Sequence, residues 1–135
     1  MINAMEVLVK YLQDAGIPAN GQVAVKHRFP DPWLVNTEAV VLQPDGGTPE
    51  LYLPVHNQRV EARCYAGSAY DALALLDSIN NLALGTGREV VSTTQGSAVL
   101  YSFSQESGPS LLFDDVLNMD FALAFYEIRV SHQAV

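Results

Sequence analysis

Residues 58–85 read QRVEARCYAGSAYDALALLDSINNLALG, and this stretch decides the fold. In its first part, residues 58–66, apolar and polar side chains alternate, which places Val60, Ala62 and Cys64 on one face. An alternation of period two predicts a strand that buries one face and exposes the other.

The second part of the same stretch, from residue 69 to about 84, predicts a helix. Ser68 is placed to cap its N-terminus, with Asp71 three residues later, and Gly85 and Gly87 end it. The helix would be roughly 24 Å long, and it carries a wide apolar stripe that predicts burial against other elements. The stripe consists of Tyr70, Leu73, Leu76 and Ala83, with Ala72, Leu75, Ile79 and Leu82 offset from them.

Upstream, residues 2–15 predict another helix. Asn3 can cap it, Glu6 occupies the reciprocal position of a capping box, and Gly16 ends it. The apolar residues that follow helical spacing on one face are Val7, Leu8, Tyr11, Leu12 and Ala15.

Two further strands are predicted between the helices. Residues 22–28 alternate, and residues 38–43 include a continuous apolar run that suits a central strand covered on both faces. Residues 44–57 contain three prolines and two glycines. That composition disfavours a central strand and predicts a long loop or a projecting hairpin.

Downstream, residues 88–94 and 97–104 predict a hairpin around Gln95-Gly96, and residues 105–117 predict an irregular stretch. Residues 118–131 alternate but are apolar on both faces, so we expect this strand in the middle of a sheet. The predicted order is α-β-β-β-α-β-β-β in one domain, residues 1–135. This is an α+β fold, a mostly antiparallel sheet with two main helices packed on one side.

The composition disfavours several classes of protein. The formal net charge is −8 and the seven Lys and Arg residues are scattered, so sequence-specific nucleic-acid binding is not expected. The single cysteine, Cys64, excludes an intrachain disulfide and a zinc site of several cysteines. We expect neither a signal peptide nor a membrane-spanning segment.

The sequence contains no pattern that predicts catalysis, a cofactor or a metal. His27, His56 and His132 lack the spacing of a metal-binding helix. Gly85-Thr86-Gly87 ends a helix instead of opening one, so it does not predict a phosphate-binding loop. Cys64, in mid-strand, is expected to be a buried apolar residue and not a nucleophile. We therefore expect a protein that is not an enzyme.

Apolar residues in predicted loops are the candidates for a binding surface. Trp33 lies in a proline-rich stretch, and Leu51, Tyr52, Leu53 and Val55 lie within residues 44–57. Exposed apolar loops often mark partner sites. The alternative, which the sequence leaves open, is that these residues fold back over the edge of the sheet.

Three blocks of sequence together suggest a family. The first helix reads INAMEVLVKYLQDAG, and the middle block combines a strand ending in Arg-Cys-Tyr with Tyr-Asp-Ala and an amphipathic helix. The last block contains LYSFSQESGPSLLFDD and MDFALAFYEIRV. These blocks resemble the tail terminator, or tail completion, proteins of long-tailed bacteriophages. The resemblance covers nearly the whole chain, and residues 29–57 fit it least.

The resemblance implies a homo-hexameric ring that caps the phage tail tube, halts its polymerisation and meets the head–tail connector or stopper protein. It implies a location at the head-proximal end of the virion tail, after assembly in the host bacterial cytoplasm. DNA would only pass through the ring, and an acidic lumen would keep phosphates from binding. The candidates for that wall are Glu106, Asp114, Asp115 and Asp120, and those for contact with another subunit or the tube are Trp33 and residues 44–57.

Three alternatives stay open. Another head–tail junction component, such as a stopper, connector or minor capsid-type protein, would also form rings and would differ in its partner. A small bacterial ligand-binding domain would be a monomer or dimer with an apolar pocket. An enzyme that relies on Cys64 would lose its activity in a Cys64→Ala variant.

Overall fold

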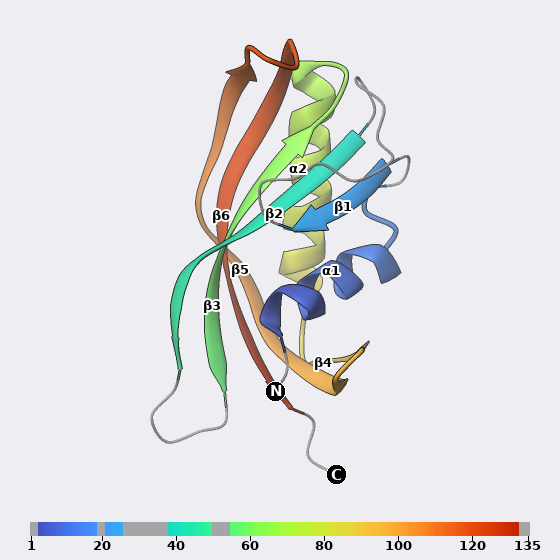
Figure 1. The fold of residues 1–135 in the computed structure, drawn as a ribbon, viewed down its shortest axis with the longest axis vertical. Coiled ribbons are helices and arrows are strands. Elements are labelled where there is room, and N and C mark those ends of the chain that lie inside the picture. Colours follow the sequence, from blue (N-terminus) through green and yellow to red (C-terminus); the bar gives the residue numbers. More distant parts are fainter. Residues whose placement is uncertain (1–2, 19–20, 26–37, 50–54, 133–135) are drawn as a thin grey trace.

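The computed structural model describes residues 3–18, 21–25, 38–49 and 55–132, and Figure 1 shows their arrangement. In this part of the chain, helices and strands follow one another in the predicted order α-β-β-β-α-β-β-β. They are α1 (Ala4–Asp14), β1 (Gly21–Val25), β2 (Glu38–Pro49), β3 (His56–Tyr65), α2 (Ala69–Gly85), β4 (Glu89–Thr93), β5 (Gly96–Asp114) and β6 (Met119–His132).

The described strands form one twisted sheet in the order β1-β2-β3-β6-β5-β4. Only the β1–β2 pair is parallel, and the other neighbouring pairs are antiparallel. The expected α+β fold with a mostly antiparallel sheet is therefore confirmed. The last strand, β6, lies between β3 and β5, as its two apolar faces predicted.

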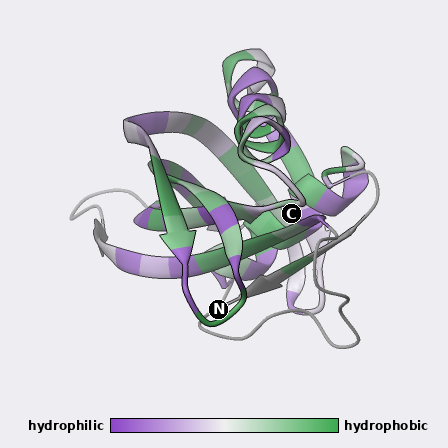
Figure 2. Cartoon of the chain, turned by 90° about the horizontal axis from the view of Figure 1, so that it is seen from above, coloured by the Kyte–Doolittle hydropathy of each residue, from purple (hydrophilic) through white to green (hydrophobic). Residues whose placement is uncertain are grey.

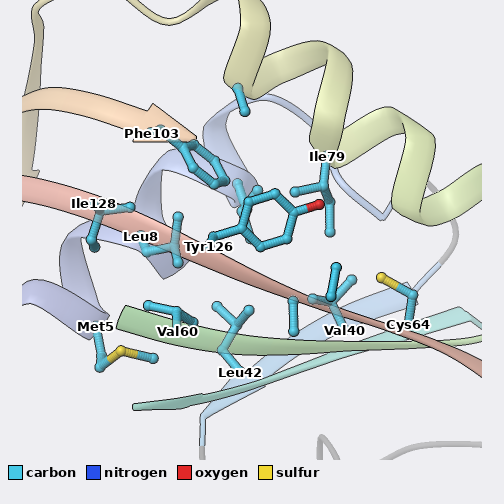
Figure 3. Close-up of a cluster of buried hydrophobic side chains, with 14 of the residues drawn as sticks. Met5, Leu8, Val40, Leu42, Val60, Cys64, Ile79, Phe103, Tyr126 and Ile128 are labelled. Atoms are coloured by element: carbon cyan, nitrogen blue, oxygen red, sulfur yellow. The ribbon is translucent and has the colours of Figure 1, made fainter. Parts of the chain in front are cut away.

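The main hydrophobic core lies between one face of the sheet and the two helices (Figures 1 and 3). Tyr126 and Ile128 of β6 lie beside Leu8 of α1 and Ile79 of α2, and none of the four is more than 1% exposed. Burial of each such side chain stabilises the fold by about 1.5–3 kcal/mol. Figure 2, coloured by hydropathy, shows hydrophobic and hydrophilic residues mixed along a helix, as one-sided burial requires.

The predicted helix caps are present. The Asn3 side chain accepts a hydrogen bond from the backbone N–H of Met5 at 2.9 Å, and the Ser68 hydroxyl accepts one from the N–H of Asp71 at 3.2 Å. Gly16 follows α1 with a positive φ of 73°, which glycine adopts without strain. The helix boundaries therefore depend on local residues that the sequence identifies correctly.

The apolar stripe of α2 is narrower than predicted. Ala72, Leu75, Leu76, Ile79 and Ala83 are buried, whereas Tyr70 is 87% exposed, so the prediction that Tyr70 belongs to the stripe is wrong. A helix turns by about 100° per residue. Tyr70 therefore points about 200° away from the buried Ala72, into solvent.

The prediction of an irregular stretch at residues 105–117 is also wrong, because β5 continues to Asp114. Its pairing with β6 shifts between Gln105 and Ser107 and again between Ser107 and Ser110, so extra residues are accommodated as bulges. One bulge contains Gly108, with a φ of 98°. Bulges tolerate the glycine and proline that seemed to exclude a strand.

The described parts of residues 44–57 are two paired strand segments, the end of β2 and the start of β3. Strand β2 runs beyond the predicted end at residue 43 to Pro49, and it pairs with β3 as far as His56. Its earlier part, from Ala39 to Leu42, is buried on both faces, as predicted for a central strand. The predicted strand 22–28 is observed over Gly21–Val25, and residues 26–28 lie outside the described residues.

The hairpin predicted around Gln95-Gly96 is present, displaced by one residue. Thr93 pairs with Gly96, so Thr94 and Gln95 form the turn. This hairpin places the short strand β4 at one edge of the sheet.

Candidate assembly surfaces

Most of the predicted interface residues cannot be placed in this structure. Trp33, Leu51, Tyr52 and Leu53 lie outside the described residues. Val55 is described, and it is partly buried immediately before β3. The interface role of these five residues stays a prediction.

The four predicted lumen acids fall in two places. Asp114 ends β5, Asp115 lies in the turn that follows, and Asp120 lies near the start of β6. Glu106 lies midway along β5, away from that turn. The structure therefore brings three of the acids to one hairpin tip and separates the fourth.

Asp114 has a structural role at the tip. Its carboxylate accepts hydrogen bonds from the backbone N–H groups of Val116 at 2.9 Å and Leu117 at 3.0 Å. An aspartate that bonds to the backbone two and three residues ahead stabilises a tight turn. A function for Asp114 as a free surface charge is correspondingly less favoured.

The same tip carries an exposed apolar surface that the sequence did not predict. The exposed fractions are 46% for Leu111, 43% for Leu112, 53% for Phe113 and 94% for Val116. We call these four residues the tip patch. Exposed apolar side chains that lie together often mark contact with another protein. The Leu-Leu-Phe run at residues 111–113 could have indicated this surface. It lies in the predicted irregular stretch, because Gly108 and Pro109 precede it.

The tip patch occupies both faces of the β5–β6 hairpin. Leu112 pairs with Phe121, whose side chain lies on the face of the sheet opposite the helices. Leu111 pairs with Ala122, which belongs to the main core, so it lies on the face that carries the helices. A hairpin that is apolar on both faces and half exposed is suited to insertion between partners.

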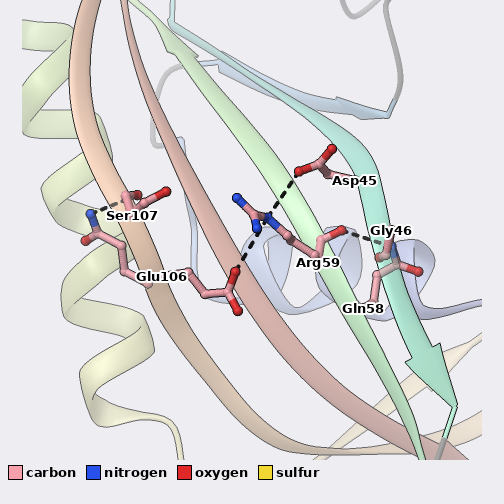
Figure 4. Close-up of polar contacts among 7 residues, drawn as sticks. Asp45, Gly46, Gln58, Arg59, Glu106 and Ser107 are labelled. Atoms are coloured by element: carbon pink, nitrogen blue, oxygen red, sulfur yellow. Dashed lines mark hydrogen bonds and ion pairs between the residues drawn. The ribbon is translucent and has the colours of Figure 1, made fainter.

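On the helix-free face, an ionic cluster joins the strands (Figure 4). Arg59 of β3 lies between the carboxylates of Asp45 on β2, at 3.1 Å, and Glu106 on β5, at 3.5 Å. Its guanidinium also lies 4.8 Å from the ring centre of Phe125 on β6. These groups are partly exposed, so each ion pair contributes only about 0–1 kcal/mol. Glu106 nevertheless forms an ion pair with Arg59, whereas the sequence predicted a free charge in the lumen.

Glu127 of β6 belongs to the same cluster. A hydrogen bond with Glu106 raises the pKa of Glu127 above its ordinary value, with smaller effects of burial and of the Glu106 charge in the same direction. The positive charge of Arg129 opposes this shift. The raised pKa means that Glu127 binds a proton more readily than an ordinary glutamate does.

A smaller apolar cluster covers the helix-free face near the hairpin tip. It consists of the buried residues Ala39, Val41, Tyr65, Met119 and Phe121. The rings of Tyr65 and Phe121 stack with their centres 4.9 Å apart. The sequence predicted an apolar face of β6 here, but it predicted that the face of β3 opposite Val60, Ala62 and Cys64 is exposed. That prediction is wrong for Tyr65, which is 2% exposed because it packs on Phe121. The cluster adjoins Leu112 of the tip patch.

Cys64 is fully buried in the main core. Burial raises the pKa of its thiol, and the nearby charge of Glu38 raises it further. The thiolate, not the thiol, is the nucleophile. The surroundings of Cys64 therefore suit a packing residue, as the sequence indicated, and they argue against the alternative of a cysteine enzyme.

The described residues include no group of three His, Cys, Asp or Glu side chains placed to hold a metal ion. Within the same ranges, neither helix combines the length and the apolar character needed to cross a membrane.

The chain was also compared with known proteins. No protein-family model matches it, and no curated protein matches it significantly.

Proposed function

We propose that this chain is a structural protein of a bacteriophage virion that caps the tail tube as a homo-hexameric ring. In that role it ends tail polymerisation and forms the tail side of the head–tail joint. Its partners are further copies of itself, the major tail tube protein and the connector or stopper protein. The proposal rests on the sequence resemblance and on the architecture of the described residues.

The observation that carries the proposal is the exposed apolar tip of the β5–β6 hairpin. Leu111, Leu112, Phe113 and Val116 lie there at 43–94% exposure. A protein that acts alone gains nothing from such a surface, whereas a subunit buries it against its neighbours. The apolar tip therefore favours an assembling protein.

One hollow among the described residues bears on the ligand-binding alternative. A hollow near the C-terminal end of α1 is lined by Ile17, Pro18, Leu75 and Ser78 among others, and its volume is about 150 Å³. Sites for small organic ligands usually have about 300–1,000 Å³. This hollow is accordingly too small for a typical ligand site.

The charge of the chain suits a ring through which DNA passes. Each copy has a formal charge of −8, so six copies carry 6 × (−8) = −48. Like charge keeps phosphates from binding to the wall of a channel. Asp115 and Asp120, at the hairpin tip, remain the lumen candidates that have no assigned structural contact. Asp114 and Glu106 have structural contacts as well.

The first experiment is the native mass by light scattering over a concentration series, together with electron microscopy of the protein mixed with purified tail tubes. We expect a species near six times 14.7 kDa, or rings at tube ends. A Leu112→Ser variant should lose ring or tube binding, and Leu84→Ser, at an exposed leucine of α2, is the matched control.

Each outcome of this experiment assigns the function differently. A protein that forms no ring and binds no tube end contradicts the proposal. Rings that bind the connector but not the tube would assign the chain to another head–tail junction component.

A further inference from the structure

The strand registers align the sheet into rows that cross it from edge to edge. One row runs from Gln22 on β1 through Ala39, Tyr65 and Phe121 to Leu112 on β5. At this level the outermost strands of the described sheet are β1 and β5. Strand β4 does not reach this level, because it pairs only with residues 96–100 of β5.

Two strand edges are therefore open at the same level of the sheet. From residue 101 to 114, β5 pairs with β6 on one side and with no described strand on the other. Strand β1 pairs with β2 on one side, and no described strand lies on its other side. An open edge presents backbone N–H and C=O groups that can pair with another strand.

The directions of the two open strands are complementary. Strand β1 is parallel to β2, and the three steps from β2 to β3, β6 and β5 each reverse the direction. Strand β1 therefore runs antiparallel to β5. A second copy placed beside the first in the same orientation presents its β1 antiparallel to the open edge of β5. The sheet can then continue across the boundary as an ordinary antiparallel ladder.

We infer that residues 110–113 of one copy pair with β1 of the next copy, so that one continuous sheet crosses each subunit interface. This contact joins two different patches, as every ring requires. The inference deepens the proposed function and rests on it for the closure of the ring. Strand addition of this kind supplies affinity through backbone hydrogen bonds and specificity through side chains.

The length of β1 and its position in the sheet both match the open edge of β5, which favours a second copy of the chain as the partner. Strand β1 has five residues, and the rows place Gln22 level with Leu112 and Ala24 level with Ser110. The bulge at Gly108 interrupts the edge beyond Ser110, so the regular part of the edge has nearly the length of β1. Pairing would also cover Leu111 and Leu112, which are about half exposed in the single chain.

The charges on the open edge of β5 also favour β1 of a second copy as the partner strand. The open part of β5 carries Glu106 and ends at Asp114. Strand β1, Gly21–Val25, carries no charge. Pairing of β5 with a second β5 would bring these carboxylates together, whereas pairing with β1 would not.

The test is a disulfide between the two edges. Residues directly opposite each other in an antiparallel pair have Cα atoms about 4.5–5.5 Å apart, which a disulfide can span. The double variant Gln22→Cys, Leu112→Cys is oxidised at high protein concentration and run on a non-reducing gel. We expect a ladder of linked species that ends at the ring size. Gln22→Cys with Ser110→Cys detects a register shifted by two residues.

The matched control combines Gln22→Cys with Val90→Cys, an exposed position on β4. The wild-type protein controls for Cys64, which is buried. Equal ladders from the test and control pairs, or no ladder from Gln22 with either Leu112 or Ser110, overturn the inference. If the disulfide test fails but the protein still caps tube ends, only the proposed β1–β5 interface is wrong. If capping is absent as well, the proposed function fails with it.

Discussion

The carboxylate of Glu6 accepts a hydrogen bond from the backbone N–H of Thr94 at 2.6 Å and another from the Thr94 hydroxyl at 3.0 Å. The two residues are 88 positions apart in the sequence. Their contact joins the first turn of α1 to the turn between β4 and β5. It takes the place of the capping-box contact that the sequence predicted for Glu6.

Replacing Glu6 by Gln should therefore make stability less dependent on acid pH. The backbone bond from Thr94, followed by its hydroxyl bond, lowers the pKa of Glu6. A lowered pKa contributes stability above the ordinary Glu value, and this contribution is lost as the pH falls through the folded-state value. Urea unfolding from pH 7 to about pH 3 should show Glu6→Gln less stable than wild type at pH 7, with the difference closing in acid. Glu89→Gln matches the charge change on β4, and an equal effect there would contradict this role of Thr94.

Glu127→Gln should have the opposite dependence on pH. The pKa of Glu127 is raised, chiefly by its hydrogen bond with Glu106, so the protonated form is favoured in the fold. The stability gained in this way is present below the ordinary Glu pKa and is lost as the pH rises through the folded-state value. Glutamine stays neutral, so the variant should lose less stability than wild type between about pH 4 and pH 7. Parallel curves for the two proteins would contradict the raised pKa of Glu127.

Gly108→Ala should destabilise the protein by about 1–3 kcal/mol. Gly108 has a φ of 98°, and an added Cβ would lie 2.8 Å from the carbonyl oxygen of Leu123 and 3.0 Å from the Cα of Ala124. Both neighbours are backbone atoms of the central strand, so neither moves easily. Gly87→Ala meets no atom within 4 Å and should change the free energy of unfolding by less than about 0.5 kcal/mol. Chemical denaturation measures both, and equal stabilities would mean that the bulge adapts.

The Cys64 thiol should not react in the folded protein. It is fully buried and its pKa is raised, so a disulfide reagent should modify it only after unfolding. A Val90→Cys variant supplies an exposed thiol outside the proposed interface, and it should react at once. Cys64→Ser places a hydroxyl in an apolar core and should cost about 1–3 kcal/mol. Rapid labelling of native wild-type protein would contradict the buried position of Cys64.

Trp33→Ala and Tyr52→Ala should weaken ring assembly and leave the protomer folded. The two residues are apolar and lie in segments rich in proline, where a role in the core is not expected. Light scattering reports assembly, and circular dichroism reports the fold. Normal assembly of both variants would remove these segments from the interface, whereas loss of the fold would indicate that they cover the sheet.

The sequence was sufficient for those parts of the fold that neighbouring residues determine. Asn3 and Ser68 act within three residues of themselves, so the helix starts could be predicted from local spacing. The alternation of β3 and β6 depends on burial alone, and it identified the core face that carries the helices. It missed the burial of Tyr65 on the opposite face, where the ring of Phe121 covers it. Two of the wrong predictions concern contacts between distant residues. Glu6 has a partner in another hairpin, and the bulges of β5 are held by pairing with β6.

The candidate site could be predicted only in part, for the same reason. Asp114, Asp115 and Asp120 are close in sequence, so their proximity at one tip required no knowledge of the fold. Glu106 meets Arg59, which is 47 positions earlier in the chain, and nothing in the local pattern of either residue indicates that contact. The tip patch was missed because a Gly-Pro pair normally marks a turn, whereas here it lies in a bulge of a long strand.

The position of α1 determines when this chain can finish folding during its synthesis. This helix packs against β1 and also against β4 and β6, which lie at the other end of the sequence. Its apolar residues Val7, Leu8 and Leu12 are made first, but the strands that bury them are complete only at His132. At 5–20 residues per second, the helix waits on the order of ten seconds for its partners. We therefore expect the chain to fold as a whole after its last strand is made, and not progressively from its first helix.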